Sequence, residues 1–157
     1  MNFVFGQDQF IANWVQQRLR EIHNGFGAYS AIGIEDNGQL IAGVVYHDYR
    51  RFSIQISMAS ETPSWCSRRT LAVLLGYPFY QCKVERITAC TAKKNKRLRS
   101  LIERLGFRLE GTLRKGFDGH SDLLIYGLLK HEASRWINRN VSQGVDHERQ
   151  SLSAACS

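Results

Sequence analysis

The stretch RITACTAKKNKRLRSLIERLGFRLEGTLR, from Arg86 to Arg114, decides the fold of this chain. It predicts a short strand over residues 86–91, a basic loop, and a helix that starts at Asn95. The apolar residues of this helix recur at helical spacing, so one of its faces packs on a sheet. They are Leu98, Leu101, Ile102 and Leu105. Gly106 then ends the helix, because glycine adopts the left-handed backbone of a C-cap at no steric cost.

The sequence on either side predicts more strands. Residues 107–114 and 122–129 form two strands joined by a polar turn that contains Asp118-Gly119. Residues 31–35 and 40–47 flank Asn37-Gly38, a dipeptide suited to a tight hairpin because both positions tolerate a positive φ. Residues 52–58 alternate between apolar and polar, which predicts a strand with one buried face.

Two further helices complete the pattern. Asp8 is the candidate N-cap of a first helix, whose apolar residues recur at helical spacing up to Leu19. A second helix runs through Leu71 and is ended or kinked by Pro78, which has no N–H to donate. The expected order is one helix, three strands, a helix, a strand, a helix and two strands, with a further short strand over residues 2–5. This order predicts a mixed α/β (α+β) fold with a largely antiparallel sheet flanked by helices.

Length and composition set the outer limits. The 157 residues, 43% of them hydrophobic, suffice for one domain with a substantial core. We expect a single domain over residues 1–138 and a flexible polar tail over residues 139–157. No apolar run approaches the roughly 20 residues of a membrane span, and the N-terminus lacks the pattern of a signal peptide. We therefore expect a cytoplasmic protein with no membrane partner.

Charge and cysteine content bear on ligands. The net charge is +7, and six basic residues lie between residues 93 and 104. Such a cluster suits a polyanion, either the phosphates of a cofactor or a nucleic acid, or it is simply a solvated helix face. The four cysteines form no CxxC pair and lie near no histidine at zinc spacing, so we expect no metal site.

The segment from Asn95 to Gly111, NKRLRSLIERLGFRLEG, resembles the second half of the GNAT N-acetyltransferase domain. The shared pattern is an Asn, a helix, Leu-Gly-Phe and Glu-Gly, and it is most similar to the branch that acetylates ribosomal proteins, antibiotics and small amines. The resemblance extends over roughly residues 8–136. It implies a GNAT-like fold, acetyl-CoA as co-substrate, and direct transfer of the acetyl group to a primary amine.

The resemblance places the pyrophosphate loop at residues 63–70, PSWCSRRT, where the family loop carries glycines and this chain has none. In one interpretation the N–H groups of Ser67 to Thr70 still bind phosphate at a helix start, and Arg68 and Arg69 add charge. In the other, the bulkier loop cannot approach a phosphate. The helix dipole disfavours two arginines at that end, so their presence favours a nearby anion.

The family pattern also marks the rest of the cofactor site. It implies that the main chain at Met58 and Ser60, at the end of the central strand, holds the pantetheine arm. Asn95 matches the family Asn that approaches the cofactor, and capping of the helix explains it equally well. The positions of the usual acid carry Ile102 and Leu98, so that group is missing here.

The general base is not fixed by the sequence. Glu61 follows the central strand and Tyr126 lies on the last strand, and these two are our candidate catalytic residues, with Glu110 as a further candidate. Each also fits a structural or solvent-facing role. His47, near a strand end, and His120, in a turn, have no acid partner nearby in the sequence, and an exposed residue without a catalytic role explains each of them.

We therefore predict an acetyl-CoA-dependent N-acetyltransferase acting on an amine-bearing acceptor, either a protein or a small molecule. The alternative is a GNAT-shaped, non-catalytic module that binds CoA, a protein or a nucleic acid. A plain nucleic-acid-binding domain is less favoured, because the basic segment lacks interleaved aromatic residues for base stacking. The choice between a monomer and a homodimer stays open.

Overall fold

The computed structural model describes residues 1–137, and these residues form one seven-stranded sheet with three α-helices. The predicted tail over residues 139–157 lies outside the described residues. The strands are β1 (Asn2–Val4), β2 (Tyr29–Asp36), β3 (Gln39–His47), β4 (Ser53–Ser60), β5 (Arg86–Ala92), β6 (Arg108–Leu113) and β7 (Leu123–Leu129). The helices are α1 (Asp8–Gln16), α2 (Arg68–Gly76) and α3 (Lys96–Leu105), with a 3₁₀ turn η1 (Pro63–Trp65) and a π-helical turn η2 (Tyr77–Gln81).

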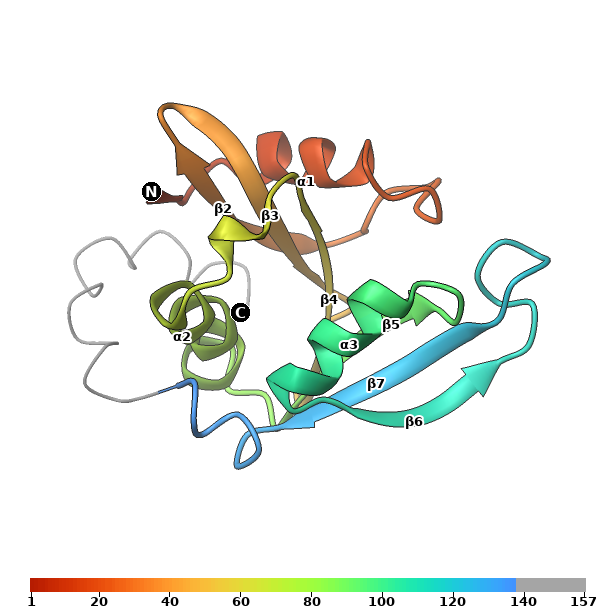
Figure 1. Ribbon diagram of the computed structural model, residues 1–157. Helices are drawn as coiled ribbons and strands as arrows, with labels where there is room; N and C mark the ends of the chain where they lie inside the picture. The colour runs from red at the N-terminus through yellow and green to blue at the C-terminus, as the bar shows by residue number, and fades with distance from the viewer. Residues whose placement is uncertain (138–157) are drawn as a thin grey trace.

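The strands lie in the order β1-β2-β3-β4-β5-β7-β6. All neighbouring pairs among the described residues are antiparallel except β4 and β5, which are parallel. The prediction of a mixed, mostly antiparallel sheet flanked by helices is therefore confirmed. Figure 1 shows β2 and β3 in one half of the molecule and β5, β7 and β6 in the other, with β4 between them.

The helices divide between the two faces of the sheet. Ile11 and Val15 of α1 are fully buried in a small core against Ala31 of β2 and Val45 of β3. The side chains of α2 and α3 pack into a larger core on the opposite face, which contains Ile54 of β4 and Ile87 of β5 among others. The face of the sheet that carries α1 is thus separate from the face that carries α2 and α3.

Close packing of α1 depends on one glycine. A Cβ atom at Gly43 would lie 2.8 Å from Cγ2 of Val15 and 3.1 Å from Cγ2 of Ile11. These separations are far below ordinary contact, so glycine is required at this point of β3 for the helix to lie flat on the strand.

Several local predictions are confirmed. Asn37 and Gly38 have φ values of 50° and 76°, as the tight β2–β3 hairpin requires. The Oδ1 of Asn95 accepts a hydrogen bond from the Leu98 N–H at 3.1 Å, and Gly106 ends α3 with φ 105°. The second helix ends before Pro78, which lies in η2.

The predicted cap of the first helix is wrong. Gln7 occupies the N-cap position without a side-chain hydrogen bond, and Asp8 is the first residue inside α1. The Asp8 carboxylate instead accepts a hydrogen bond from the Ala31 N–H at 2.9 Å. It therefore ties the helix to β2, which a local sequence pattern cannot indicate.

Candidate active site

The sheet opens between β4 and β5. The parallel ladder runs from Ser53↔Arg86 to Ile56↔Ala89 and stops there. Beyond that pair, β4 continues to Ser60 beside β3 only, and β5 continues to Ala92 beside β7 only. The main chain of β4 from residue 57 onward has no strand partner on this side within the described residues, so its polar groups are free for a ligand. Met58 and Ser60 lie in this part of β4.

The start of α2 combines a closed cap with two open N–H groups. The Thr70 N–H donates to Oγ of Ser67 at 3.2 Å, and the Ser67 N–H donates to Oγ1 of Thr70 at 2.9 Å. This capping box satisfies two main-chain N–H groups at the helix N-terminus that have no acceptor within the helix. The N–H groups of Arg68 and Arg69 have no acceptor among the described residues, and both residues are exposed. Of the four predicted site residues at this helix start, Ser67 and Thr70 cap the helix, whereas Arg68 and Arg69 have main-chain N–H groups without an acceptor among the described residues.

Positive charge gathers around these two N–H groups. The Arg69 guanidinium lies 5.9 Å from the centre of the Phe3 ring and lines a pocket of about 120 Å³ with Ser67 and Thr70. The Arg68 guanidinium donates to the main-chain carbonyl of Arg135 at 2.9 Å. Neither arginine forms an ion pair with a described residue, so their charge is available to an anion.

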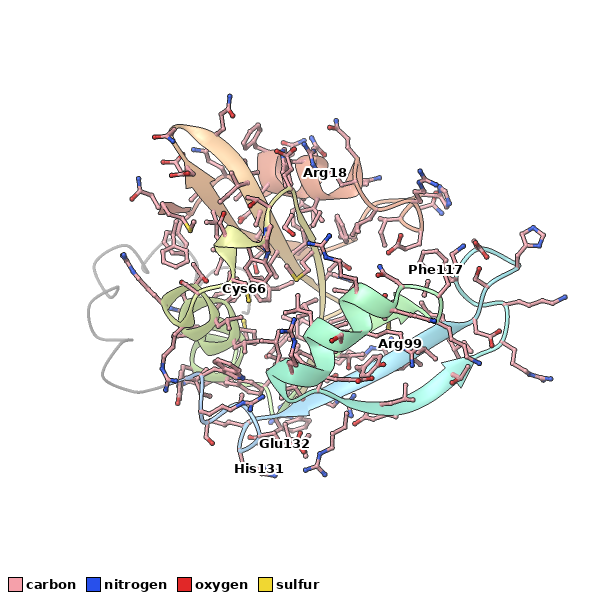
Figure 2. The ribbon with its side chains drawn as sticks, viewed as in Figure 1. Arg18, Cys66, Arg99, Phe117, His131 and Glu132 are labelled. Carbon is pink, nitrogen blue, oxygen red and sulfur yellow. The ribbon has the colours of Figure 1, made fainter. Side chains whose placement is uncertain are left out.

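Arg104, in the last turn of α3, adds a further positive charge near the start of α2. Burial raises the pKa of the Cys66 thiol, and the positive charge of Arg104 on α3 opposes this change. Arg104 is therefore close enough to act on the loop before α2. Figure 2 shows Cys66 beside α2.

Asn95 lies at the open end of β5. It follows the strand by three residues, is exposed, and caps α3. Capping accounts for its side-chain oxygen, and its amide nitrogen has no partner among the described residues. The capping role predicted from the sequence is thus confirmed, whereas the role toward a cofactor stays a prediction.

The two candidate catalytic residues are not brought together. Glu61 follows β4, and its carboxylate pairs with Arg18 at 2.5 Å; the Arg18 guanidinium in turn lies 3.7 Å from the centre of the Trp14 ring. Tyr126 is fully buried under α3, where its hydroxyl donates to Glu103 at 3.0 Å. It also accepts from Nε of Arg99 at 3.4 Å, and Figure 2 shows Arg99 on the side of α3 toward β7. Glu61 thus lies on the α1 side of the sheet and Tyr126 on the α3 side, and a catalytic role for either stays a prediction.

Glu110 has a structural environment. Its carboxylate pairs with Arg86 at 2.6 Å across β7, and it covers Gly127, where a Cβ atom would lie only 2.3 Å from Oε1 of Glu110. The contacts brace the three strands β5, β7 and β6.

One polar residue was misjudged from the sequence. His47 is not an exposed loop residue, because it ends β3 and is only 9% exposed. Its Nε2 lies 2.9 Å from Oγ of Ser57, and its ring centre lies 5.2 Å from that of Phe26. Burial lowers the pKa of His47, and the charge of Asp48 opposes this change. The strand predicted over residues 40–47 already ended at His47, and this was the signal for its place in the sheet.

The cysteines at the site are not activated nucleophiles. Cys66 and Cys90 are free, and burial raises the pKa of both thiols. The reactive form of cysteine is the thiolate, which a raised pKa disfavours. The family positions of the acid, Ile102 and Leu98, pack into the core instead. Neither of these two thiols is thus set up as a nucleophile.

The chain is similar to known proteins in part of its sequence and in its fold. No protein-family model matches the chain. A putative ribosomal N-acetyltransferase of Bacillus subtilis, YdaF, is 40% identical over 62 residues, which cover 38% of this chain. The chain spans about a third of the length of that relative, since the match covers 34% of it.

Solved structures extend the likeness to most of the chain. The spermidine N-acetyltransferase SpeG of Vibrio cholerae has a TM-score of 0.67 at 19% identity, covering 89% of this chain and 99% of that one. RimJ of Mycobacterium smegmatis, solved in complex with CoA-disulfide, has a TM-score of 0.59 at 24% identity, with coverages of 75% and 61%. The chain therefore has the GNAT acetyltransferase fold.

Proposed function

We propose that this protein is an N-acetyltransferase that moves an acetyl group from acetyl-CoA directly to a primary amine. One observation carries the proposal: β4 and β5 part after the Ile56↔Ala89 pair, next to a helix start with two open N–H groups. An extended ligand with an anionic group fits both features at once.

The residues of the chain suit acetyl-CoA in distinct ways. The N–H groups of Arg68 and Arg69 hold the pyrophosphate, since helix starts bind anions through such donors. Ser67 and Thr70 support them by keeping the first turn in place. The unpaired main chain from Met58 to Ser60 pairs with the amides of the pantetheine arm. The complex of RimJ with CoA-disulfide supports this choice of ligand.

The charged neighbours strengthen the same site. Arg69 and Arg104 flank the helix start, and Asn95 offers its amide at the open end of β5. Arg68 and Arg69 are exposed residues, and their N–H groups donate to no described residue, which supports a helix start that the glycine-free loop leaves open. This favours the first of the two interpretations of the loop.

Direct transfer needs a neutral amine, a polarised thioester carbonyl and a tolerable leaving group. A free N–H of the open β4 edge can donate to the carbonyl oxygen. The thiolate of CoA is a stable leaving group, and water can protonate it where Ile102 and Leu98 offer no acid. Transfer of the acetyl group to the amine therefore needs no nucleophilic side chain of the protein.

The acceptor is a protein amine or a small polyamine. YdaF and SpeG are named for ribosomal and spermidine acetylation respectively, and they support these two classes. We place the protein in the cytoplasm as one domain over residues 1–138, either a monomer or a homodimer. None of the helices in residues 1–137 is long and apolar enough to cross a membrane.

The test begins with binding. Acetyl-CoA should raise the melting temperature of the wild-type protein, because a ligand that binds only the folded state stabilises it. Reversing both charges in Arg68→Glu/Arg69→Glu should abolish the shift. The matched control is Arg20→Glu/Arg51→Glu, which changes the net charge equally at exposed positions away from α2.

A mass-spectrometric screen then tests transfer. The purified protein is incubated with acetyl-CoA and spermidine, a lysine peptide or short peptides with free N-termini. A mass increase of one acetyl group on any of these amines supports the enzyme. A melting shift with no acetylated amine supports the alternative, a non-catalytic CoA-binding module. No shift, combined with a steeply salt-dependent affinity for RNA, points to nucleic-acid binding.

A further inference from the structure

A partly buried hydrogen-bonded pair lies on the face of the sheet opposite α2 and α3. His47 at the end of β3 and Ser57 on β4 are joined by the 2.9 Å contact between Nε2 and Oγ. The ring of Phe26, from the loop between α1 and β2, packs against the imidazole at a tilted angle. The parts of the acetyl-CoA site proposed above leave this pair without a role.

The pair stands where the sheet opens. Ser57 is the first residue of β4 beyond the last β4–β5 pair, Ile56↔Ala89. Ser57 lies opposite Val45 in the β3–β4 ladder, and Val45 packs against α1, so the Ser57 side chain is on the α1 face. On the same face, Nε2 of Gln55 lies 3.8 Å from Sγ of Cys90 across the two strands.

The two faces of the sheet therefore offer different chemical groups at the opening. The face with α2 and α3 offers main-chain donors and arginines to phosphate groups. The α1 face offers the Ser57 hydroxyl, hydrogen-bonded to the His47 imidazole, which can accept a proton in its neutral form. An amine that meets a thioester lying in the opening has to come from the side that the cofactor phosphates do not occupy.

We propose that Ser57 and His47 form a relay that removes a proton from the acceptor amine during acetyl transfer; this rests on the proposed function. Ser57 meets the amine, and His47 acts through it. The imidazole tautomer with its proton on Nδ1 accepts a hydrogen bond at Nε2 from the Ser57 hydroxyl.

The step balances without any further reagent. The amine nitrogen attacks the thioester carbon, so a C–N bond forms and the C–S bond breaks, with its electron pair going to sulfur. The nitrogen loses one proton to Oγ of Ser57 as the hydroxyl passes its own proton to Nε2 of His47. Water protonates the CoA thiolate, and the imidazolium returns its proton to water. The products are an amide and CoA.

The surroundings keep His47 ready to accept a proton. Burial lowers its pKa, so the ring is neutral near pH 7, while the carboxylate of Asp48 opposes the change. Its neighbours across the ladders are Tyr29 on β2, which is titratable, and Gln55 on β4, which is not. Asp48 is the charged group that acts on it.

The experiment compares full-length wild type with Ser57→Ala and His47→Gln, using the best amine acceptor from the screen. Glutamine keeps much of the size and polarity of histidine but cannot take up a proton. We expect each variant to lose about 10²-fold in kcat/KM, within the range for loss of a general base. Melting temperatures and the acetyl-CoA shift should stay near wild type. The control is His131→Gln, an exposed histidine outside the site, which should keep full activity.

The pH profile separates a proton relay from a structural role. In wild type both the amine and His47 must be deprotonated, so log(kcat/KM) should fall on the acid side with a limiting slope of about two. In His47→Gln only the amine titrates, and the slope should be about one. Equal slopes in both proteins overturn the relay alone. A wild type that binds acetyl-CoA but acetylates no amine overturns the proposed function and the relay with it.

Discussion

Ile56 of β4 and Ala89 of β5 are the last residues that pair across the parallel junction of the sheet. Both strands continue beyond them, each bound to its outer neighbour, and the candidate site lies between the two free edges. The core stays continuous through this junction, because Ala89 is buried and Ile56 is partly buried in the larger core. The opening therefore belongs to the fold itself and does not depend on displaced side chains.

Gly43→Ala should destabilise the protein by about 1–3 kcal/mol, as overpacking of a tight core does. The added methyl would meet Val15 of α1 at 2.8 Å. Urea denaturation of both proteins measures the difference. Gly111→Ala is the matched control, since a Cβ atom at Gly111 has no neighbour within 4 Å. Equal losses in the two variants would contradict the packing argument.

Tyr126→Phe distinguishes a structural from a catalytic tyrosine. The hydroxyl joins β7 to α3 through Glu103 and Arg99, so its loss should cost about 0.5–1.5 kcal/mol of folding free energy. If this is its whole role, kcat should stay within about twofold of wild type. A fall of about 10²-fold with unchanged stability would instead support the catalytic role predicted from the sequence.

Ser67→Ala removes one half of the capping box at the start of α2. Loss of an N-cap costs about 1 kcal/mol, which thermal or urea denaturation detects. Because the first turn frays, the affinity for acetyl-CoA should fall as well. Ser67→Asp keeps the cap in the free protein, yet its negative charge should still weaken binding of a pyrophosphate. An unchanged affinity in Ser67→Asp would argue against phosphate at this helix start.

Asp118 in the β6–β7 turn should titrate abnormally. Main-chain N–H groups of Ser121 and His120 donate to its carboxylate, and these lower its pKa to about 2. A lowered pKa stabilises the folded turn at pH values above the unfolded pKa near 4, and this contribution is lost as the pH falls toward 2. Carboxyl carbon shifts followed by NMR from pH 5 to 1.5 measure the midpoint. A midpoint near 4 would mean that the two hydrogen bonds do not form in solution.

Local signals account for the parts of the fold that the sequence predicts. Asn37-Gly38 and Gly106 each require a positive φ, and Asn95 caps the helix within three residues, so neighbours in sequence suffice. Asp8 shows the limit of this reasoning. Its partner, the Ala31 N–H, lies 23 residues away, and only the assembled sheet brings the two together.

The candidate site depends mainly on such distant contacts. The basic residues near α2 and the end of β4 were predicted as site residues from the family pattern, and their role toward a cofactor stays a prediction. His47 was missed, since its burial requires Ser57 from the next strand and Phe26 from a loop 21 residues earlier. The Arg18 partner of Glu61 was likewise invisible, at a separation of 43 residues.

The short junction between β4 and β5 has a mechanical consequence. Four residue pairs, from Ser53↔Arg86 to Ile56↔Ala89, join the two halves of the sheet at this point. A pantetheine arm that hydrogen-bonds to the free edge of β4 would take the place of the strand partner that β4 lacks beyond Ile56. The amides of residues 57–60 would then exchange with deuterium more slowly, and the molecule would become stiffer as it loads its substrate.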